Sequence, residues 1–515
     1  ENLEQVLANI SLGGMTSAAI NNIYINTMYY TKSHKIKGSE TVVLATKSTS
    51  KSITVSTLAN ISTYDKYGHY SIVIKYTDNT YKSYICDTID TTTGIITLDR
   101  ELEDKTVYGF SMMFNSENGQ HLTAYGYAGL AQFIYDELKN EKKISKYIWK
   151  FNPYECVGTG VWSNPDIKNL DGTTFLDVSF YGGVTGGGYV ANTDNTLATS
   201  IGLQEVNPDV STTQRKRYGI RSGTAGQGVS FPVTLGVDGY IEIGLGINYT
   251  QSYTLSGITK YTRGGCTVVL LDNLGVEIFS KTITSGLIKV MIPISSTVPN
   301  GTLIFKSATS EPTAISINEI LIWEGTIESV SLKNKNIGVI ADSWSQYPLT
   351  STEYAQKPTR PYDGAFAEGY QYLTVKMEEY ALTKNELITT KNYGRGGQTS
   401  EWGKYWAKNL KNNSLDYAIC SFYINDNNSV DEFNSNAVSS YDFSLTNPYT
   451  SQNSNSGGVY GSVSYDKWLL NIQNIKEQIN GMGAKAIILM PSHTASSAQT
   501  SSTMGMNGMF LKNII

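Results

Sequence analysis

The sequence predicts a chain that combines an α/β region, built on a parallel sheet, with two all-β regions. From residue 336 onward, short apolar runs such as Ile337–Ile340 and Ala486–Met490 alternate with helical patterns, which is typical of a parallel sheet. Between residues 155 and 327, strand candidates separated by turn signals indicate a β-sandwich or jelly roll. Between residues 36 and 113, apolar and polar residues alternate with a period of two, which indicates a small antiparallel β unit.

The remaining elements can be assigned in order along the chain. A helical stripe begins at Leu3 and stops at Gly13-Gly14, and a short strand follows at Ile23–Ile25. After the small β unit, apolar residues at helical spacing predict a helix over residues 121–140. The expected strands of the β-sandwich include Tyr240–Ile243, Cys266–Leu271, Val276–Ser280, Leu287–Ile294, Thr302–Phe305 and Ile315–Trp323. The α/β region adds a helix, a strand and a second helix over Gly364–Leu382, Asp416–Ile424 and Lys467–Ile479.

Composition excludes several classes of function. With 515 residues, 17% charged residues and a net charge of −5, the chain is not a polybasic nucleic-acid binder. Its four cysteines are far apart and show no CxxC spacing, so we expect no zinc site, no other metal and no cofactor. No apolar run approaches the ~18 residues of a membrane helix, so we expect no membrane partner. The chain begins at Glu1 instead of Met, and we expect it to be a processed or excised piece of a longer protein.

Polar residues follow two of the predicted parallel strands. Asp342 and Ser343 come directly after the strand at 337–340, and Asn425 follows the strand at 416–424. Gly397 lies in a glycine-rich segment between them. A serine, a glycine N–H and an Asn amide at the carboxyl edge of one sheet are the parts of a nucleophile and its oxyanion hole. The alternative is that Asp-Ser caps a helix.

A serine nucleophile needs a base, and the sequence offers four histidines. His121 stands directly before the amphipathic helix of residues 121–140, and His493 follows the strand that ends at Met490-Pro491. Taken by itself, His121 is more typical of a solvent-facing residue at a helix start. Since no GxSxG motif is present, the sequence argues against an α/β-hydrolase elbow.

Together these segments resemble the SGNH (GDSL-type) hydrolase family. The family's serine, glycine, GxND and DxxH blocks are matched by Ala341-Asp342-Ser343, Gly397-Gln398-Thr399, Tyr423-Ile424-Asn425-Asp426 and Asn118-Gly119-Gln120-His121. The resemblance covers roughly residues 330–515 and 1–145 and implies a three-layer α/β fold assembled from both ends of the chain. The chain is then divided into the C-terminal part of the hydrolase (1–35 and 114–150), a β insertion (36–113), a carbohydrate-binding-like sandwich (151–329) and the N-terminal part of the hydrolase (330–515).

The resemblance also implies the parts that individual residues play. Ser343 would be the nucleophile and His121 the base, with Gly397 and Asn425 at the oxyanion. We expect the neighbouring residues Trp344, Asp342, Tyr423 and Asp426 to contact the substrate.

Three positions depart from the family pattern. Ala341 and Tyr423 replace glycines, and Asn118 stands where the family has the Asp that orients the histidine. An Asn accepts a hydrogen bond from the imidazole N–H but does not stabilise the imidazolium by charge. A Ser–His dyad, or another carboxylate such as Glu117, would then serve instead.

The blocks occur in circularly permuted order, because the DxxH block precedes the serine block. Joining residue 515 to residue 1 restores the family order and continues one helical stripe, since Leu511, Ile514 and Ile515 lead in helical register to Leu3 and Val6. A permuted chain, a window spanning parts of two hydrolase domains, and a backbone break within one domain all explain this order. We favour the explanations that give one complete site per chain.

The sequence therefore predicts a serine ester hydrolase that deacetylates an O-acetylated bacterial surface polysaccharide. A sandwich beside such a hydrolase resembles phage tail-spike deacetylases, so we expect a phage tail protein, extracellular or on the virion surface, and a homo-oligomer, a trimer if it is a tail protein. Trp162 and Trp344 are candidates for stacking on sugars, whereas Trp323 lies in an alternating strand and is expected in the core. The alternatives are a catalytically degenerate glycan-binding protein on the same fold and a purely structural tail or surface protein.

Overall fold

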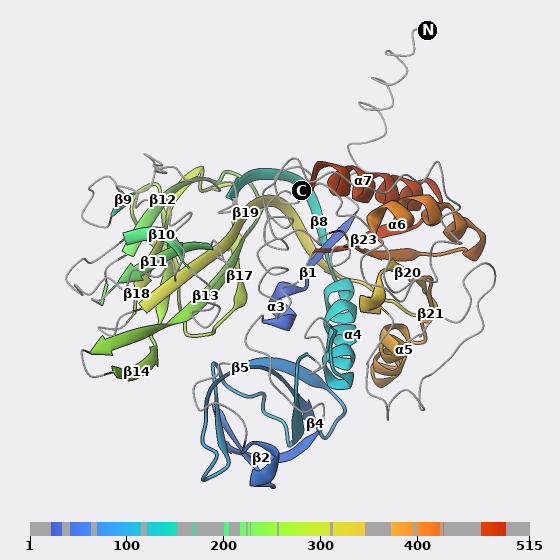
Figure 1. Cartoon of the computed structure of the whole chain (residues 1–515). Coiled ribbons are helices and arrows are strands. Elements are labelled where there is room, and N and C mark those ends of the chain that lie inside the picture. Colours follow the sequence, from blue (N-terminus) through green and yellow to red (C-terminus); the bar gives the residue numbers. More distant parts are fainter. Residues whose placement is uncertain are drawn as a thin grey trace.

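A computed structural model shows three units, an α/β unit, a β-barrel and a β-sandwich (Figure 1). The structure describes residues 22–32, 42–62, 70–114, 121–151, 168–169, 200–204, 217–222, 225–226, 228–254, 257–308, 313–345, 372–394, 399–422, 426 and 465–490. The predicted helix near Leu3 and its continuation from Leu511 lie outside these residues.

The α/β unit is built on a five-stranded parallel sheet in the order β1-β23-β22-β20-β21. Its strands are β1 (Ile23–Asn26), β20 (Asn336–Ala341), β21 (Thr389–Asn392), β22 (Tyr417–Ser421) and β23 (Lys485–Met490). Edge strand β1 comes from the beginning of the sequence and pairs in parallel with β23 from its end. One sheet therefore contains strands from both ends of the chain.

Helices cover this sheet on two sides. The helices are α3 (Met28–Thr31), α4 (Ala124–Lys139), α5 (Tyr372–Thr383), α6 (Ser400–Trp406) and α7 (Tyr465–Gly481). The 3₁₀ turns η4 (Ser343–Ser345) and η6 (Ala407–Asn413) belong to the same unit, whereas η2 (Leu58–Asn60) lies between barrel strands. Helices α6 and α7 pack together above the sheet in Figure 1, whereas α4 packs on α5 below it. The helix predicted at 121–140 is α4, whose apolar stripe is fully buried in the core beneath the strands.

Strands β2 to β7, between residues 43 and 112, form a closed barrel in the order β2-β3-β6-β5-β4-β7. The strands are β2 (Val43–Thr49), β3 (Ser52–Val55), β4 (Ser71–Tyr76), β5 (Tyr81–Ile89), β6 (Ile95–Leu98) and β7 (Val107–Met112). Their apolar residues fill a separate core, which explains the period of two in the sequence. Closure leaves the barrel with no unpaired sheet edge.

The β-sandwich consists of two antiparallel sheets with a shared apolar core. One sheet contains β8 (Asn140–Phe151), β10 (Ser200–Gln204), β11 (Arg217–Ser222), β13 (Gly239–Thr254), β14 (Gly257–Arg263), β17 (Ile288–Ile294) and β19 (Thr313–Ser329). The other contains β9 (Lys168–Asn169), β12 (Gly228–Thr234), β15 (Cys266–Asp272), β16 (Glu277–Ile283) and β18 (Asn300–Ser307). Trp323 is fully buried, as its alternating strand predicts.

Strand β8 joins the α/β unit to the sandwich, because it follows α4 directly and pairs with β19. Side chains alternate between the two faces of a strand. Glu141 accordingly forms ion pairs with Lys143 and with Lys485 of β23. Its neighbour Lys142 pairs instead with Glu242 of β13. This strand therefore binds both neighbouring sheets through adjacent residues.

Candidate functional site

The carboxyl ends of the parallel strands bring several predicted site residues to one edge of the sheet. Strand β20 ends at Ala341, so Asp342 and the backbone of Ser343 lie at this edge, at the start of η4. Strand β22 ends beside them, because the Asp342 N–H donates to the carbonyl of Ser421 at 3.2 Å. Strand β21 ends at Asn392 on the other side of β20. Parallel α/β sheets bind their ligands at this edge.

A network of hydrogen bonds fixes the turn that carries Ser343. Asp342 Oδ1 accepts from the Trp344 N–H at 2.9 Å. The Ser345 hydroxyl and the Asn392 Oδ1 lie 3.1 Å apart, and Asn392 Nδ2 donates to the Ser345 carbonyl at 2.8 Å. Asn392 thus bonds to both the side chain and the carbonyl group of Ser345 in η4, a role that the sequence did not reveal. The available signal was a polar residue before a glycine-rich segment, and it was no stronger than at many loop positions.

Gly394 has to be a glycine for this turn to close. A Cβ added there would lie 2.2 Å from the Ser345 Oγ and 2.9 Å from the Ala341 carbonyl oxygen. Its own N–H donates to Asn392 Oδ1 at 2.7 Å. The first glycine after β21 therefore allows the backbone to approach the turn after β20.

Asp426 connects the loop after β22 to the start of α6. Its carboxylate accepts from the Ser400 N–H at 2.9 and 3.0 Å and from the Ser400 hydroxyl at 2.5 Å. Asn471 of α7 donates to the Ser400 hydroxyl and to Glu401, at 3.0 and 3.1 Å. Burial raises the pKa of Asp426 to about 7, and the Ser400 hydrogen bonds act in the opposite direction.

Burial changes the expected part of three residues. Asp342 and Asp426 are fully buried, and Trp344 is 2% exposed in the core of the α/β unit. The carboxylates of Asp342 and Asp426 bond to the protein's own groups and so position the loops at the sheet edge. That these three residues contact the substrate stays a prediction.

His121 lies at the same edge because α4 runs antiparallel to the strands. The last turn of α4 is at the amino ends of the strands, since the Lys139 carbonyl accepts from the Val330 N–H, shortly before β20. The first turn is at the carboxyl end of β1, since the Tyr30 hydroxyl of α3 donates to the Gly126 carbonyl at 2.8 Å. His121 directly precedes this turn.

The barrel holds the start of α4 in place. Thr123 is the N-cap residue, and its side chain accepts from the Gly126 N–H at 3.0 Å. The same hydroxyl donates to the carbonyl of Met112, the last residue of β7, at 2.7 Å. His121 is 8% exposed, and burial lowers its pKa to about 4. The neutral imidazole, which is the form that accepts a proton, therefore prevails at pH 7.

The structure does not describe every predicted site residue. Asn118, Gly397, Tyr423 and Asn425 lie outside the described residues, as do His493 and Trp162. The backbone of Ser343 is described. Within the described ranges, no group of three or more His, Cys, Asp and Glu residues is arranged to hold a metal ion. No helix among those same residues has the length and apolar content needed to cross a membrane.

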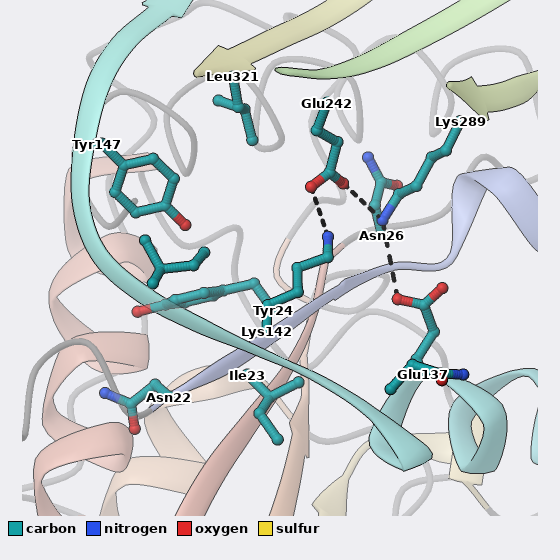
Figure 2. Close-up of a pocket in the computed structure, with 12 residues that line it drawn as sticks. Asn22, Ile23, Tyr24, Asn26, Glu137, Lys142, Tyr147, Glu242, Lys289 and Leu321 are labelled. Atoms are coloured by element: carbon teal, nitrogen blue, oxygen red, sulfur yellow. Dashed lines mark hydrogen bonds and ion pairs between the residues drawn. The ribbon is translucent and has the colours of Figure 1, made fainter. Parts of the chain in front are cut away.

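A second candidate, a narrow cavity of about 40 Å³ between β1, β8 and the sandwich, is occupied by ion pairs (Figure 2). Glu242 lies between Lys142 and Lys289, at 2.5 and 2.9 Å. Lys289 also faces Glu137 of α4 at 3.9 Å. Although burial acts to raise the pKa of Glu242, the two lysines hold that pKa well below its usual value. Because its charged groups already bind one another, this cavity is a junction between units.

The comparisons found distant structural similarity. No family model matches the sequence, and no curated protein matches it. A family two carbohydrate esterase from Cellvibrio japonicus is similar over 69% of this chain and 85% of its own, at 10% identity and a TM-score of 0.21. An acetyl xylan esterase from the rumen bacterium Butyrivibrio proteoclasticus is similar over 56% and 78%, at 14% identity and a TM-score of 0.19. Similarity at these TM-scores supports no conclusion about this chain.

Proposed function

We propose that this chain is a serine ester hydrolase that removes acetyl groups from an O-acetylated bacterial surface polysaccharide. One observation carries the proposal. The parallel sheet and the antiparallel course of α4 bring Ser343 and His121, from distant parts of the sequence, to the same edge. Both residues belong to sequence blocks that resemble the catalytic blocks of one hydrolase family.

In this mechanism the Ser343 hydroxyl attacks the acyl carbonyl carbon while neutral His121 accepts its proton. The tetrahedral oxyanion accepts hydrogen bonds from the N–H groups of Ser343 and Gly397 and from the Asn425 amide; loss of one such donor typically costs ~2.7–4 kcal/mol. His121 then protonates the leaving sugar oxygen, and an acetyl-serine remains. A water molecule, deprotonated by His121, releases acetate and restores the serine.

As part of the same proposal, the chain acts as a phage tail protein outside the host cell. Two features support this setting. The chain carries a β-sandwich next to its α/β unit, and its composition favours Ser, Thr, Asn and Tyr over Lys and Glu. A tail protein would assemble as a trimer.

The test compares Ser343→Ala with Ser331→Ala, which changes an exposed serine before β20. We expect Ser343→Ala to lower hydrolysis of 4-nitrophenyl acetate by about 10³-fold or more. Ser331→Ala should leave it unchanged, and circular dichroism should show both variants folded. Unchanged turnover in Ser343→Ala contradicts the proposal. No acetate release by the unaltered chain, with polysaccharide binding retained, favours the degenerate glycan-binding alternative.

A further inference from the structure

A larger cavity, of about 280 Å³, lies where the barrel, α3, α4 and β17 meet. It is on the side of α4 that faces away from the parallel sheet. Leu130 and Ile134 of α4 are buried in the core under the sheet, whereas Gln132, Phe133 and Asp136 line the cavity. The cavity is therefore separate from the sheet edge that carries Ser343.

Aromatic rings form part of its wall. Tyr30 of α3 stacks on Phe133 with ring centroids 5.7 Å apart, and Tyr81 of β5 lies beside them on the barrel. Tyr29 adds a further ring, 5.3 Å below the ammonium group of Lys289. Tyr29 and Tyr30 are nearly buried, so Phe133 and Tyr81, which are partly exposed, provide the apolar ring surface of this otherwise polar cavity.

Polar side chains line the same cavity. Gln132 Oε1 accepts from the Tyr81 N–H at 2.8 Å, and its amide also bonds to Asp136. Burial raises the pKa of Asp136. On the barrel side, Lys82 pairs with Glu103 at 2.5 Å. The wall therefore presents cationic and anionic side chains together, and neither sign of charge dominates it.

Arg100 lines the cavity and contributes a planar guanidinium group to its wall. One terminal nitrogen of its guanidinium donates to the Ser83 carbonyl, and the group lies 4.9 Å from the Tyr84 ring. Its Nε is buried and has no hydrogen-bond partner among the described residues.

We propose that this cavity binds one uncharged sugar residue, as an anchoring subsite for the polysaccharide remote from the hydrolytic edge. Sugar C–H faces pack on aromatic rings, and each hydroxyl both donates and accepts, so it needs the mixture of donors and acceptors found here. A charged ligand would instead require one dominant sign of charge. The identification of the ligand as part of the substrate rests on the proposed function.

The experiment measures sugar binding in the full chain carrying Ser343→Ala, so that hydrolysis does not interfere. Methyl β-glucoside, β-galactoside, α-mannoside and β-xyloside are the neutral probes, and methyl β-glucuronoside is the anionic probe. Isothermal titration and saturation-transfer NMR detect the binding. Arg100→Lys removes the planar donor group, and Phe133→Leu removes the stacking ring. Tyr405→Leu is the matched control, because Tyr405 lies 39% exposed on α6, outside the cavity.

We expect saturable binding of at least one neutral glycoside, weakened about tenfold or more by Arg100→Lys and by Phe133→Leu, a change of roughly 1.4 kcal/mol. Tyr405→Leu should have no effect. Absence of saturable binding, preference for the glucuronoside, or equal affinity in all variants overturns the proposal. Hydrolysis of 4-nitrophenyl acetate by the chain with Ser343 intact separates this failure from a failure of the proposed function.

Discussion

At the scale of single residues, burial decides what the polar groups at the sheet edge do. His121 and Asp426 are both nearly or fully withdrawn from water, and both therefore favour their neutral forms. In the proposed mechanism, the neutral form of His121 is the base. For Asp426 the protonation state governs the hydrogen bonds to Ser400 that hold the start of α6.

The first prediction concerns the pH dependence of hydrolysis. Because burial lowers the pKa of His121 to about 4, the imidazole stays neutral as the pH falls and becomes protonated only near pH 4. We expect kcat/KM for 4-nitrophenyl acetate to fall on the acid side with a midpoint near 4 instead of about 6.5. The measurement is a pH–rate profile accompanied by circular dichroism to confirm folding at each pH.

The variant Asn118→Asp should have a different pH–rate profile from the unaltered chain. A carboxylate at this position of the DxxH block would favour the imidazolium and move the acid limb toward higher pH. An acid limb near 6.5 in the unaltered chain, unmoved by this variant, would contradict the assignment of His121 as a buried base.

At the scale of elements, α4 links the sheet edge that carries Ser343 to the rest of the molecule. Its last turn is fixed by Glu386, which accepts from Tyr135 and Lys139 at 2.6 Å each. Its first turn is fixed by Thr123 and by close contact with the end of β7. The amphipathic stripe predicted the helix, but the two anchors come from segments distant in sequence and were not predictable.

The second prediction tests the anchor at the start of α4. A Cβ at Gly126 would lie 2.5 Å from the Met113 carbonyl oxygen, a backbone atom that does not move aside easily. We expect Gly126→Ala to displace the first turn and His121 with it, lowering kcat/KM by about 10²-fold and reducing the melting temperature. Gly481→Ala, at a helix end with open space around it, should change neither quantity. Equal activity in the two variants would show that His121 does not depend on this contact.

At the scale of the whole molecule, buried ion pairs join the units. Adjacent residues of β8 hold Lys485 of the parallel sheet and Glu242 of the sandwich. Glu242 is 4% exposed and depends on two lysines for its charge. The sequence showed these residues as scattered charges, since only the pairing of β8 with β19 brings them together.

The third prediction concerns this junction. Removing one partner of a buried ion pair typically costs about 3–5 kcal/mol, so Glu242→Gln should lower the free energy of unfolding by that order. Glu379→Gln breaks an exposed pair with Lys376 and should cost less than about 0.5 kcal/mol. Chemical denaturation measures both values.

The ion pairs of Glu242 also determine how the free energy of unfolding changes with pH. Since the folded pKa of Glu242 lies below its unfolded value, its contribution is complete above the unfolded pKa and is lost as pH falls below it. Glu242→Gln should therefore flatten the loss of stability below about pH 4.3. An unchanged acid profile would count against the ionic junction.

The sequence by itself determined the element types, because periodicity depends only on neighbouring residues. It predicted the period-two strands of the barrel, the helix α4, and the strands observed as β20 and β22. Its motif blocks also predicted that Ser343 and His121 belong to one site, and this stays a prediction. Only the tertiary structure decided that β1 completes the sheet, that Asn392 clamps the turn after β20, and that Asp342 and Asp426 are buried. These facts depend on contacts between segments far apart in the chain, and local patterns carry no record of such contacts.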